Sequence, residues 1–240
     1  MTDKDRAAEE LERTSLMRQE FTANASHELK TPLHVISGYA ELLESGMVRD
    51  EDIKVFAGKI RAEAMRMTKL VEDIIALSRL DSGGVGMKWE LTDLYKVASS
   101  AVEALAETAR EAGVRLELGP APDRPVLRRG IPHALYSIVY NLTENALKYN
   151  VPGGSVSVKI ETSEDGSAVL TVSDTGIGIP KADLERIFER FYRVDKSHSK
   201  EVGGTGLGLS IVKHAAMTHN ARIEVQSEEG RGSVFKVLFS

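Results

Sequence analysis

Apolar residues repeated every seven positions between residues 29 and 77 constrain the fold more than any other feature of this chain. They form four rows: Leu29/Ile36/Leu43, Leu33/Ala40/Met47, Ile53/Ile60/Met67/Ile74 and Phe56/Leu70/Leu77, the last interrupted by Glu63. Interleaved rows of this kind give a helix one apolar stripe of the coiled-coil type. Gly46 and the charged run 49–52 separate the first two rows from the others and indicate a turn. The pattern therefore predicts two long helices joined as a hairpin.

Two helices alone bury two apolar stripes poorly. A pair of hairpins can bury them in a four-helix bundle, so we expect a homodimer. The alternative is a bundle within one chain, capped by the remaining residues.

A second domain is predicted after the glycine-rich run 82–86. We expect a helical domain at 1–82, a linker at 83–88 and a second domain at 89–240. Within the second domain the patterns predict helices at 93–112, 132–149 and 207–219, and strands at 88–91, 114–118, 155–162, 168–173, 222–227 and 233–239. Helices mixed with mostly antiparallel strands are typical of a two-layer α/β sandwich.

Composition excludes several classes of protein. The 31 basic and 36 acidic residues give a net charge of −5, which argues against a nucleic-acid binder with a broad basic face. Cysteine is absent, which excludes disulfides, thiolate zinc sites and a cysteine nucleophile. The longest apolar run, 74–77, is far shorter than the about 20 residues of a membrane-spanning helix. We therefore expect no membrane contact in this segment and no signal peptide.

His27 is the first candidate for chemistry. With Leu29 at zero and about 100° per residue, His27 falls at about 160° and Thr31 at about −160°, on the face opposite the apolar stripe. Pro32 removes a backbone hydrogen bond, so a local bend is expected there. Neutral imidazole is a good nucleophile, and Glu28 could accept the proton of its other nitrogen. An ordinary surface histidine remains the alternative.

Two glycine clusters are the second candidate. One, at 174–178, follows a predicted strand, and the other, at 203–209, opens a predicted helix. Backbone amides at a helix N-terminus suit phosphate oxygens. A P-loop and a Rossmann fingerprint are both excluded by the glycine spacing. Simple turns remain the alternative.

A polar helical face is the third candidate. Asn141, Asn145 and Lys148 are spaced i, i+4 and i+7 on one face of a predicted helix. Amide oxygens suit Mg²⁺, and the lysine suits phosphate. A plain solvated face is the alternative.

These elements, in this order, resemble the transmitter region of a bacterial sensor histidine kinase, over about Arg18 to Phe239. The matching segments are an H-box at 27–33, an N-box at 141–149, a first glycine box at 174–180, an F-box at 188–193 and a second glycine box at 204–209. The His-Glu-x-x-Thr form of the H-box is similar to the subgroup that includes phosphate-limitation sensors. The resemblance implies a dimerisation and phosphoacceptor domain, then an ATP-binding domain of the GHKL type.

The resemblance also implies roles for individual residues toward Mg·ATP. Asp174 would bond the adenine amino group, Gly176 and Gly178 would let the chain pass close to the base, and Asn145 would hold Mg²⁺. Asn141, Lys148 and Tyr149 would lie beside the phosphates and ribose. The residues of the second glycine box expected at the phosphates are Gly204, Thr205, Gly206, Leu207 and Gly208. The segment 192–204 would be a mobile lid over the nucleotide.

Three positions depart from the family pattern. Ile131 replaces an acidic residue, Ser137 replaces a glutamine, and Asn220-Ala221 replaces the usual Gly-Gly. The last change is mild, because asparagine tolerates a left-handed residue after a helix.

The function expected from the resemblance is an ATP-dependent protein-histidine kinase. His27 would attack the γ-phosphate with Glu28 as base, while Arg193 spreads the developing charge. The phosphoryl group would then pass to an aspartate in the receiver domain of a response regulator. The Thr31 hydroxyl, on the same exposed face, could aim a water at that phospho-aspartate and make the protein a phosphatase as well. We expect a cytoplasmic segment of a membrane-anchored parent kinase.

Two alternatives remain open. One is a nucleotide-binding scaffold with little turnover. The other is an ATPase of the gyrase or chaperone kind, in which Glu144 would activate water. The fate of the γ-phosphate of labelled ATP separates the three.

Overall fold

The computed structural model describes residues 3–81, 86–164, 166–194 and 204–240, with side chains from Gln19 onward. Its contacts separate two compact units. The first contains Met1–Ile74 with Gly203–Thr205, and the second contains Ile75–Val202 with Gly206–Ser240. Each unit is described by itself below.

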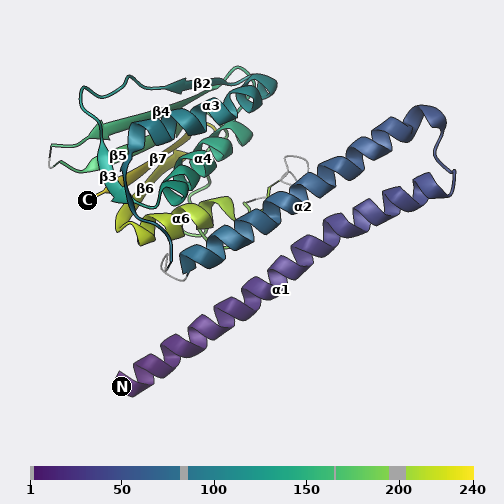
Figure 1. The fold of residues 1–240 in the computed structure, drawn as a ribbon, viewed down its shortest axis with the longest axis horizontal. Coiled ribbons are helices and arrows are strands. Elements are labelled where there is room, and N and C mark those ends of the chain that lie inside the picture. The colour runs from purple at the N-terminus through teal and green to yellow at the C-terminus, as the bar shows by residue number, and fades with distance from the viewer. Residues whose placement is uncertain (1–2, 82–85, 165, 195–203) are drawn as a thin grey trace. The chain divides into compact units, whose positions relative to one another are not determined.

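The first unit is a helical hairpin (Figure 1). Helix α1 spans Asp3–Glu44, a short 3₁₀ turn covers Asp50–Asp52, and helix α2 spans Ile53–Asp81, with its last residues in the second unit. The rings of Tyr39 and Phe56 meet edge to face, 5.3 Å apart, and join the two helices. The hairpin predicted from the heptad rows is confirmed, and α1 continues as a helix through Pro32.

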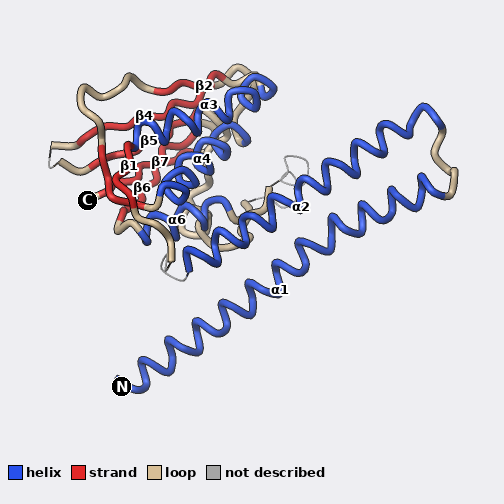
Figure 2. The backbone as a smooth tube through the Cα atoms, in the orientation of Figure 1, coloured by secondary structure: helices blue, strands red, loops and turns tan. Residues whose placement is uncertain are grey.

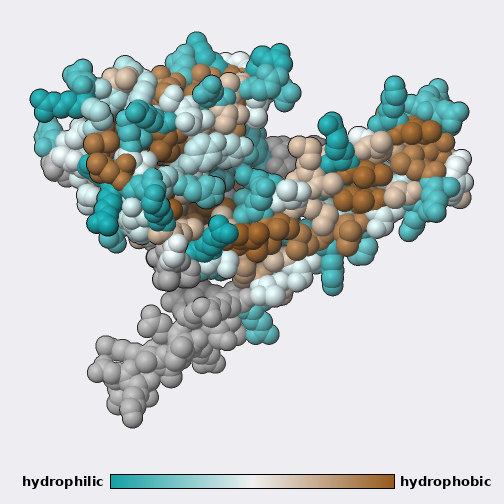
Figure 3. Space-filling view, viewed as in Figure 1, coloured by the Kyte–Doolittle hydropathy of each residue, from teal (hydrophilic) through white to brown (hydrophobic). Residues whose placement is uncertain are grey.

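Much of the apolar stripe lies on the surface of the single hairpin. Leu33, Met47 and Ile53 belong to the heptad rows, yet their exposed fractions are 52%, 77% and 43%. Further exposed apolar side chains on the two helices are Val35, Leu42, Val55, Met65, Val71 and Ile75. Figure 3 shows apolar side chains gathered along the visible face of the hairpin.

The second unit contains a five-stranded sheet in the order β2-β4-β5-β7-β6 (Figure 2). Its strands are β2 (Arg115–Leu118), β4 (Ser155–Thr162), β5 (Ala168–Asp174), β6 (Ala221–Glu228) and β7 (Gly232–Phe239). Only the pair β2–β4 is parallel among the described strands. A separate antiparallel pair joins β1 (Glu90–Asp93) to β3 (Leu127–Gly130).

Three helices cover one face of this sheet (Figure 1). They are α3 (Leu94–Ala112), α4 (Pro132–Lys148) and α6 (Gly208–Thr218). Fully buried side chains between the layers include Leu105, Leu135, Ile138, Leu142, Val158, Leu170 and Ile211. The predicted two-layer α/β sandwich is confirmed, and α4 lies between the other two helices, against both.

Local signals account for the ends of these helices. The side chain of Asp93 caps α3 by accepting a hydrogen bond from the Tyr95 amide at 3.0 Å, and Gly113 ends it in the left-handed conformation. Asn220 follows α6 with φ of 51°, as expected for an asparagine in place of the family's glycine. The strand predicted at 88–91 forms two residues later along the chain, as β1 at Glu90–Asp93.

Candidate nucleotide and phosphoacceptor sites

Helix α4 places the polar face that the sequence predicts. Asn141 is buried, whereas Asn145 and Lys148 are half-buried. The side-chain amide of Asn141 donates to the carbonyl of Ser137 at 2.8 Å, and none of the described residues donates to the Asn141 side-chain oxygen. Within the described part of the chain, no hydrogen bond is made by the Asn145 carboxamide. Its oxygen is therefore a suitable ligand for a hard cation.

The first glycine box meets the end of α4 through backbone contacts. The amide of Ile177 donates to the carbonyl of Tyr149 at 3.0 Å. A Cβ atom added to Gly176 would lie 2.3 Å from that same carbonyl oxygen. A side chain at residue 176 would push the two segments apart. Glycine is required here because the backbone of residue 176 lies so close to the Tyr149 carbonyl.

Asp174 ends β5 beside this contact. Its Oδ1 atom accepts hydrogen bonds from the amides of Gly176 at 2.8 Å and Ser233 at 3.3 Å. Among the described residues none donates to its Oδ2 atom, which is thus free to accept from an N–H of a ligand. Burial raises the pKa of Asp174, and the two backbone hydrogen bonds oppose that rise.

Gly178 lies on the far side of the same loop. It has φ of 69°, and a Cβ atom there would lie 2.1 Å from the carbonyl oxygen of Glu228, the last residue of β6. The loop after β5 is therefore held by backbone on both sides, between the end of α4 and the β6–β7 turn.

Part of the second glycine box lies against α4 as well. Gly208 begins α6, and a Cβ atom there would lie 2.9 Å from the Oδ1 atom of Asn141. Leu207 before it is fully buried. The amides at the start of a helix carry partial positive charge and attract anions, so this end of α6 suits phosphate. The two glycine boxes thus meet α4 at different points, near Asn141 and near Tyr149.

Gly204 and Thr205 belong to the other compact unit. There the Thr205 hydroxyl donates to the Oδ2 atom of Asp73 at 2.7 Å, and Asp73 is buried and lies 3.7 Å from the Lys69 ammonium. No motif in the sequence marks Asp73 as a candidate site residue. Its position between Leu70 and Leu77 of the apolar row is the signal that could have pointed to a buried carboxylate.

Lys148, Tyr149 and Arg193 form a cationic and aromatic group at the end of α4. The Lys148 ammonium lies 5.2 Å from the centre of the Tyr149 ring. Burial raises the pKa of Tyr149, and the charge of Arg193 opposes the rise. The charge of Arg193 therefore acts at Tyr149. Most of the predicted lid, residues 195–203, lies outside the described residues.

His27 lies on helix α1 of the first unit. His27 and Thr31 are both exposed, as their helical angles predict, and Glu28 is half-buried. The Thr31 hydroxyl donates to the carbonyl of His27 at 3.3 Å. Its oxygen lone pairs remain available to accept a hydrogen bond from water.

Comparisons with known proteins agree with this arrangement. Residues 17–83 match the His Kinase A (phospho-acceptor) domain, and residues 130–240 match the histidine kinase-, DNA gyrase B- and HSP90-like ATPase domain. An α/β domain of the GHKL ATPase type therefore follows a helical domain of the phosphoacceptor type.

The relatives share both domains. The chain is 38% identical to the sensor-like histidine kinase SenX3 of Mycolicibacterium smegmatis, over 93% of this chain and 57% of that protein. It is 38% identical to the phosphate regulon sensor protein PhoR of Pseudomonas aeruginosa, over 93% of this chain and 50% of that protein. The chain spans about half the length of these relatives. It belongs to the sensor histidine kinases, of which it carries the transmitter region.

Solved structures show the same fold. The histidine kinase AdeS of Acinetobacter baumannii matches with a TM-score of 0.71 at 23% identity, over 89% of this chain and 97% of that one. Full-length ShkA in complex with AMPPNP matches with a TM-score of 0.65 at 26% identity, over 92% of this chain and 45% of that one. In the described part of this chain, no helix is long and apolar enough to cross a membrane.

Proposed function

We propose that this chain is an ATP-dependent protein-histidine kinase that phosphorylates itself on His27. The observation that carries the proposal is the meeting of both glycine boxes on α4, Gly176 against Tyr149 and Gly208 against Asn141. Neither contact admits a side chain at the glycine without a shift. Simple turns do not require such contacts, and the contacts lie on the same helix and strand end as the Asn145 carboxamide and the Oδ2 atom of Asp174, which have no hydrogen-bond partner among the described residues.

The α/β domain binds the nucleotide. The Oδ2 atom of Asp174 accepts from the adenine amino group, and Gly176 and Gly178 keep side chains away from the base. The Asn145 oxygen would hold Mg²⁺, and the metal would supply positive charge for the phosphates. Asn141, Lys148, Tyr149 and the part of the second glycine box from Gly206 to Gly208 lie along the phosphates and ribose.

His27 is the nucleophile. A neutral ring nitrogen forms the N–P bond to the γ-phosphorus as the bond from that phosphorus to the departing ADP oxygen breaks. Glu28 accepts the proton from the other ring nitrogen, so the phosphohistidine does not keep an extra positive charge. Arg193 stabilises the charge on the transferring group.

The phosphoryl group then passes to an aspartate in a response-regulator receiver domain. Thr31 is exposed within one turn of His27, which supports the second proposed activity, dephosphorylation of that regulator. A hydroxyl in this place can orient water without becoming a nucleophile.

The chain functions as a homodimer. The exposed heptad residues Leu33, Met47 and Ile53 support this proposal, because burying them against a second hairpin completes a four-helix bundle. As relatives of about twice the length are sensor proteins, we further propose that this segment is the cytoplasmic part of a membrane-anchored parent.

Incubation with γ-labelled ATP and Mg²⁺ tests the proposal. A kinase leaves label on the protein, in an acid-labile form that disappears in His27→Gln. An ATPase releases labelled phosphate, and Glu144→Gln abolishes that release. A scaffold does neither, and this outcome would overturn the proposal. Asn145→Ala is the control for the nucleotide site, since alanine supplies no oxygen ligand.

A further inference from the structure

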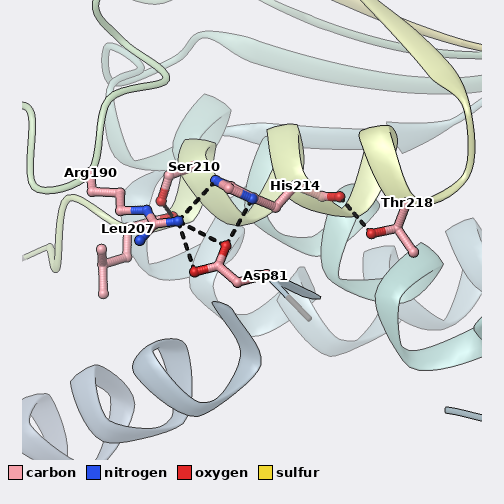
Figure 4. A network of polar contacts seen from close by, with 6 residues as sticks. All are labelled: Asp81, Arg190, Leu207, Ser210, His214 and Thr218. Atoms are coloured by element: carbon pink, nitrogen blue, oxygen red, sulfur yellow. Dashed lines mark hydrogen bonds and ion pairs between the residues drawn. The ribbon is translucent and has the colours of Figure 1, made fainter. Parts of the chain in front are cut away.

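Three ionisable side chains meet at the end of helix α2, within the second compact unit (Figure 4). Asp81 is the last residue of α2, and both of its carboxylate oxygens lie 2.8 Å from the Nη2 atom of Arg190. The Nδ1 atom of His214, on α6, lies 3.0 Å from Oδ1 of Asp81. The Nε2 atom of His214 lies 3.4 Å from Nη2 of Arg190. We call Asp81, Arg190 and His214 the polar clamp.

One arrangement of protons satisfies every contact in the polar clamp. A neutral His214 with its proton on Nδ1 donates to Asp81, and its Nε2 atom accepts from Arg190. Burial opposes ionisation of Asp81, but the hydrogen bond from His214 and the charge of Arg190 outweigh it and lower the pKa of Asp81. The carboxylate is therefore ionised at neutral pH and holds both partners.

Arg190 lies next to a strained residue that contacts the second glycine box. Phe191 has φ of 62°, which is unfavourable for an aromatic residue and persists only when its surroundings hold it. Its amide donates to the carbonyl of Gly206 at 2.9 Å, and a Cβ atom on Gly206 would lie 2.9 Å from its Cα atom. The position of Gly206 thus depends on Phe191, and Phe191 follows directly on Arg190.

His214 is connected to the second glycine box through helix α6. It lies on α6, the helix that begins at Gly208, one turn after Ser210. The buried Ser210 hydroxyl donates to the carbonyl of Leu207 at 2.7 Å, which fixes the residue between Gly206 and Gly208. Asp81 therefore binds Arg190, the neighbour of Phe191, and also His214, on the helix that follows Gly206. It links the two segments that meet at the Phe191–Gly206 contact.

We propose that Asp81, Arg190 and His214 are positioning residues that hold Gly206 and Gly208 in the geometry that binds the phosphates of ATP. The inference rests on the proposed function and extends it to residues of α2. It makes nucleotide affinity depend on the last residue of that helix. The alternative is that the polar clamp only stabilises the end of α2.

The experiment measures binding of a fluorescent trinitrophenyl-ATP, and the rate of autophosphorylation against ATP concentration, on the whole chain. Asp81→Asn, Arg190→Gln and the double variant are compared with Arg186→Gln. Arg186 is a matched control because it forms an exposed ion pair with Glu189 in the same segment. Asp81 is partly exposed, so the isosteric Asp81→Asn is expected to fold, and thermal melting verifies this.

Each single variant should weaken binding by about tenfold or more, as expected for loss of a hydrogen bond between charged groups. The double variant should bind the nucleotide no more weakly than the weaker-binding single variant, because both substitutions break the same clamp. The half-saturating ATP concentration should rise in parallel, while the rate at saturating ATP stays within about twofold. Arg186→Gln should bind as the wild type does.

The inference is overturned if the clamp variants bind within about twofold of the wild type, or lose melting temperature with unchanged affinity, or lose rate at saturating ATP instead of affinity. Failure of the proposed function looks different, because the wild type itself would then carry no acid-labile label after incubation with γ-labelled ATP, whatever the clamp variants do.

Discussion

The amide of Ile177 donates a 3.0 Å hydrogen bond to the carbonyl of Tyr149, which joins the loop after β5 to the end of helix α4. Gly176 makes this contact possible, so Gly176→Ala should destabilise the protein by about 1–3 kcal/mol, as overpacking does, and weaken ATP binding. Urea unfolding and nucleotide titration measure the two effects. Gly58→Ala is the control, because nothing lies within 4 Å of a Cβ atom at that helical position. Wild-type stability in Gly176→Ala would show that the loop can move aside freely.

Asp174 should make the stability of the folded protein and its affinity for ATP respond to pH in opposite directions. Its pKa is raised in the folded state, so its stabilising contribution is present below its unfolded pKa and is lost as the pH rises through the folded pKa. Asp174→Asn should therefore increase the melting temperature at neutral pH and change it little at acidic pH. The same variant should bind ATP more weakly at neutral pH, because asparagine with its oxygen held by the Gly176 and Ser233 amides presents an NH₂ donor to the adenine amino group instead of an acceptor. Melting curves and titrations at both pH values test this, and a lower melting temperature at neutral pH would contradict it.

His27→Gln should abolish acid-labile phosphorylation while ATP binding persists, since His27 lies on α1 and every nucleotide box lies beyond residue 140. His34→Gln is the matched control, because His34 is another exposed histidine of the same helix and should leave labelling intact. Label that survives in His27→Gln, or is lost only in His34→Gln, would move the phosphoacceptor to another residue.

Thr31→Ala should separate two activities. The hydroxyl takes no part in attack on ATP, so most autophosphorylation should remain, whereas most dephosphorylation of a phosphorylated receiver domain should be lost. The hydrogen bond from Thr31 to the His27 carbonyl makes Thr31→Ser the informative second variant, because serine keeps the hydroxyl. Equal loss of both rates in Thr31→Ala would indicate a structural role in the helix instead.

The whole chain should sediment as a dimer, and Leu33→Asp should shift it toward the monomer. A charge at this half-exposed position costs little in the single hairpin but much in a dry four-helix core. Val151→Asp is the control, since Val151 is similarly exposed but lies in a turn of the α/β domain. A wild-type monomer at micromolar concentration would refute the four-helix arrangement.

The elements that could be predicted from the sequence are those with local or periodic signals. The heptad rows predict the hairpin, Gly113 predicts the end of α3, and the alternation on both sides of Gly166 predicts the β4–β5 hairpin. Strand β3 was missed, because Leu-Arg-Arg-Gly is short and shows no alternation, and its pairing with β1 is decided by the tertiary fold.

The residues of the candidate site likewise include some that a local pattern predicts and others that only the tertiary fold brings together. Helical spacing predicts that Asn141 and Asn145 share a face, and it predicts the exposure of His27. Spacing cannot reveal that Gly208 lies against Asn141, or that Asp81 binds Arg190, which is 109 residues away in the sequence. Contacts of this kind depend on how the elements pack, and no local pattern encodes them.

The outermost strands of the five-stranded sheet determine which surfaces of this protein can join copies of it. Strand β2 is only four residues long, and strand β6 carries Arg222, Glu224, Gln226 and Glu228 at alternate positions. Short strands and charged side chains discourage a second chain from adding to an unpaired edge. The sheet is thus protected against edge-to-edge aggregation, and association between copies is left to the apolar faces of the helices.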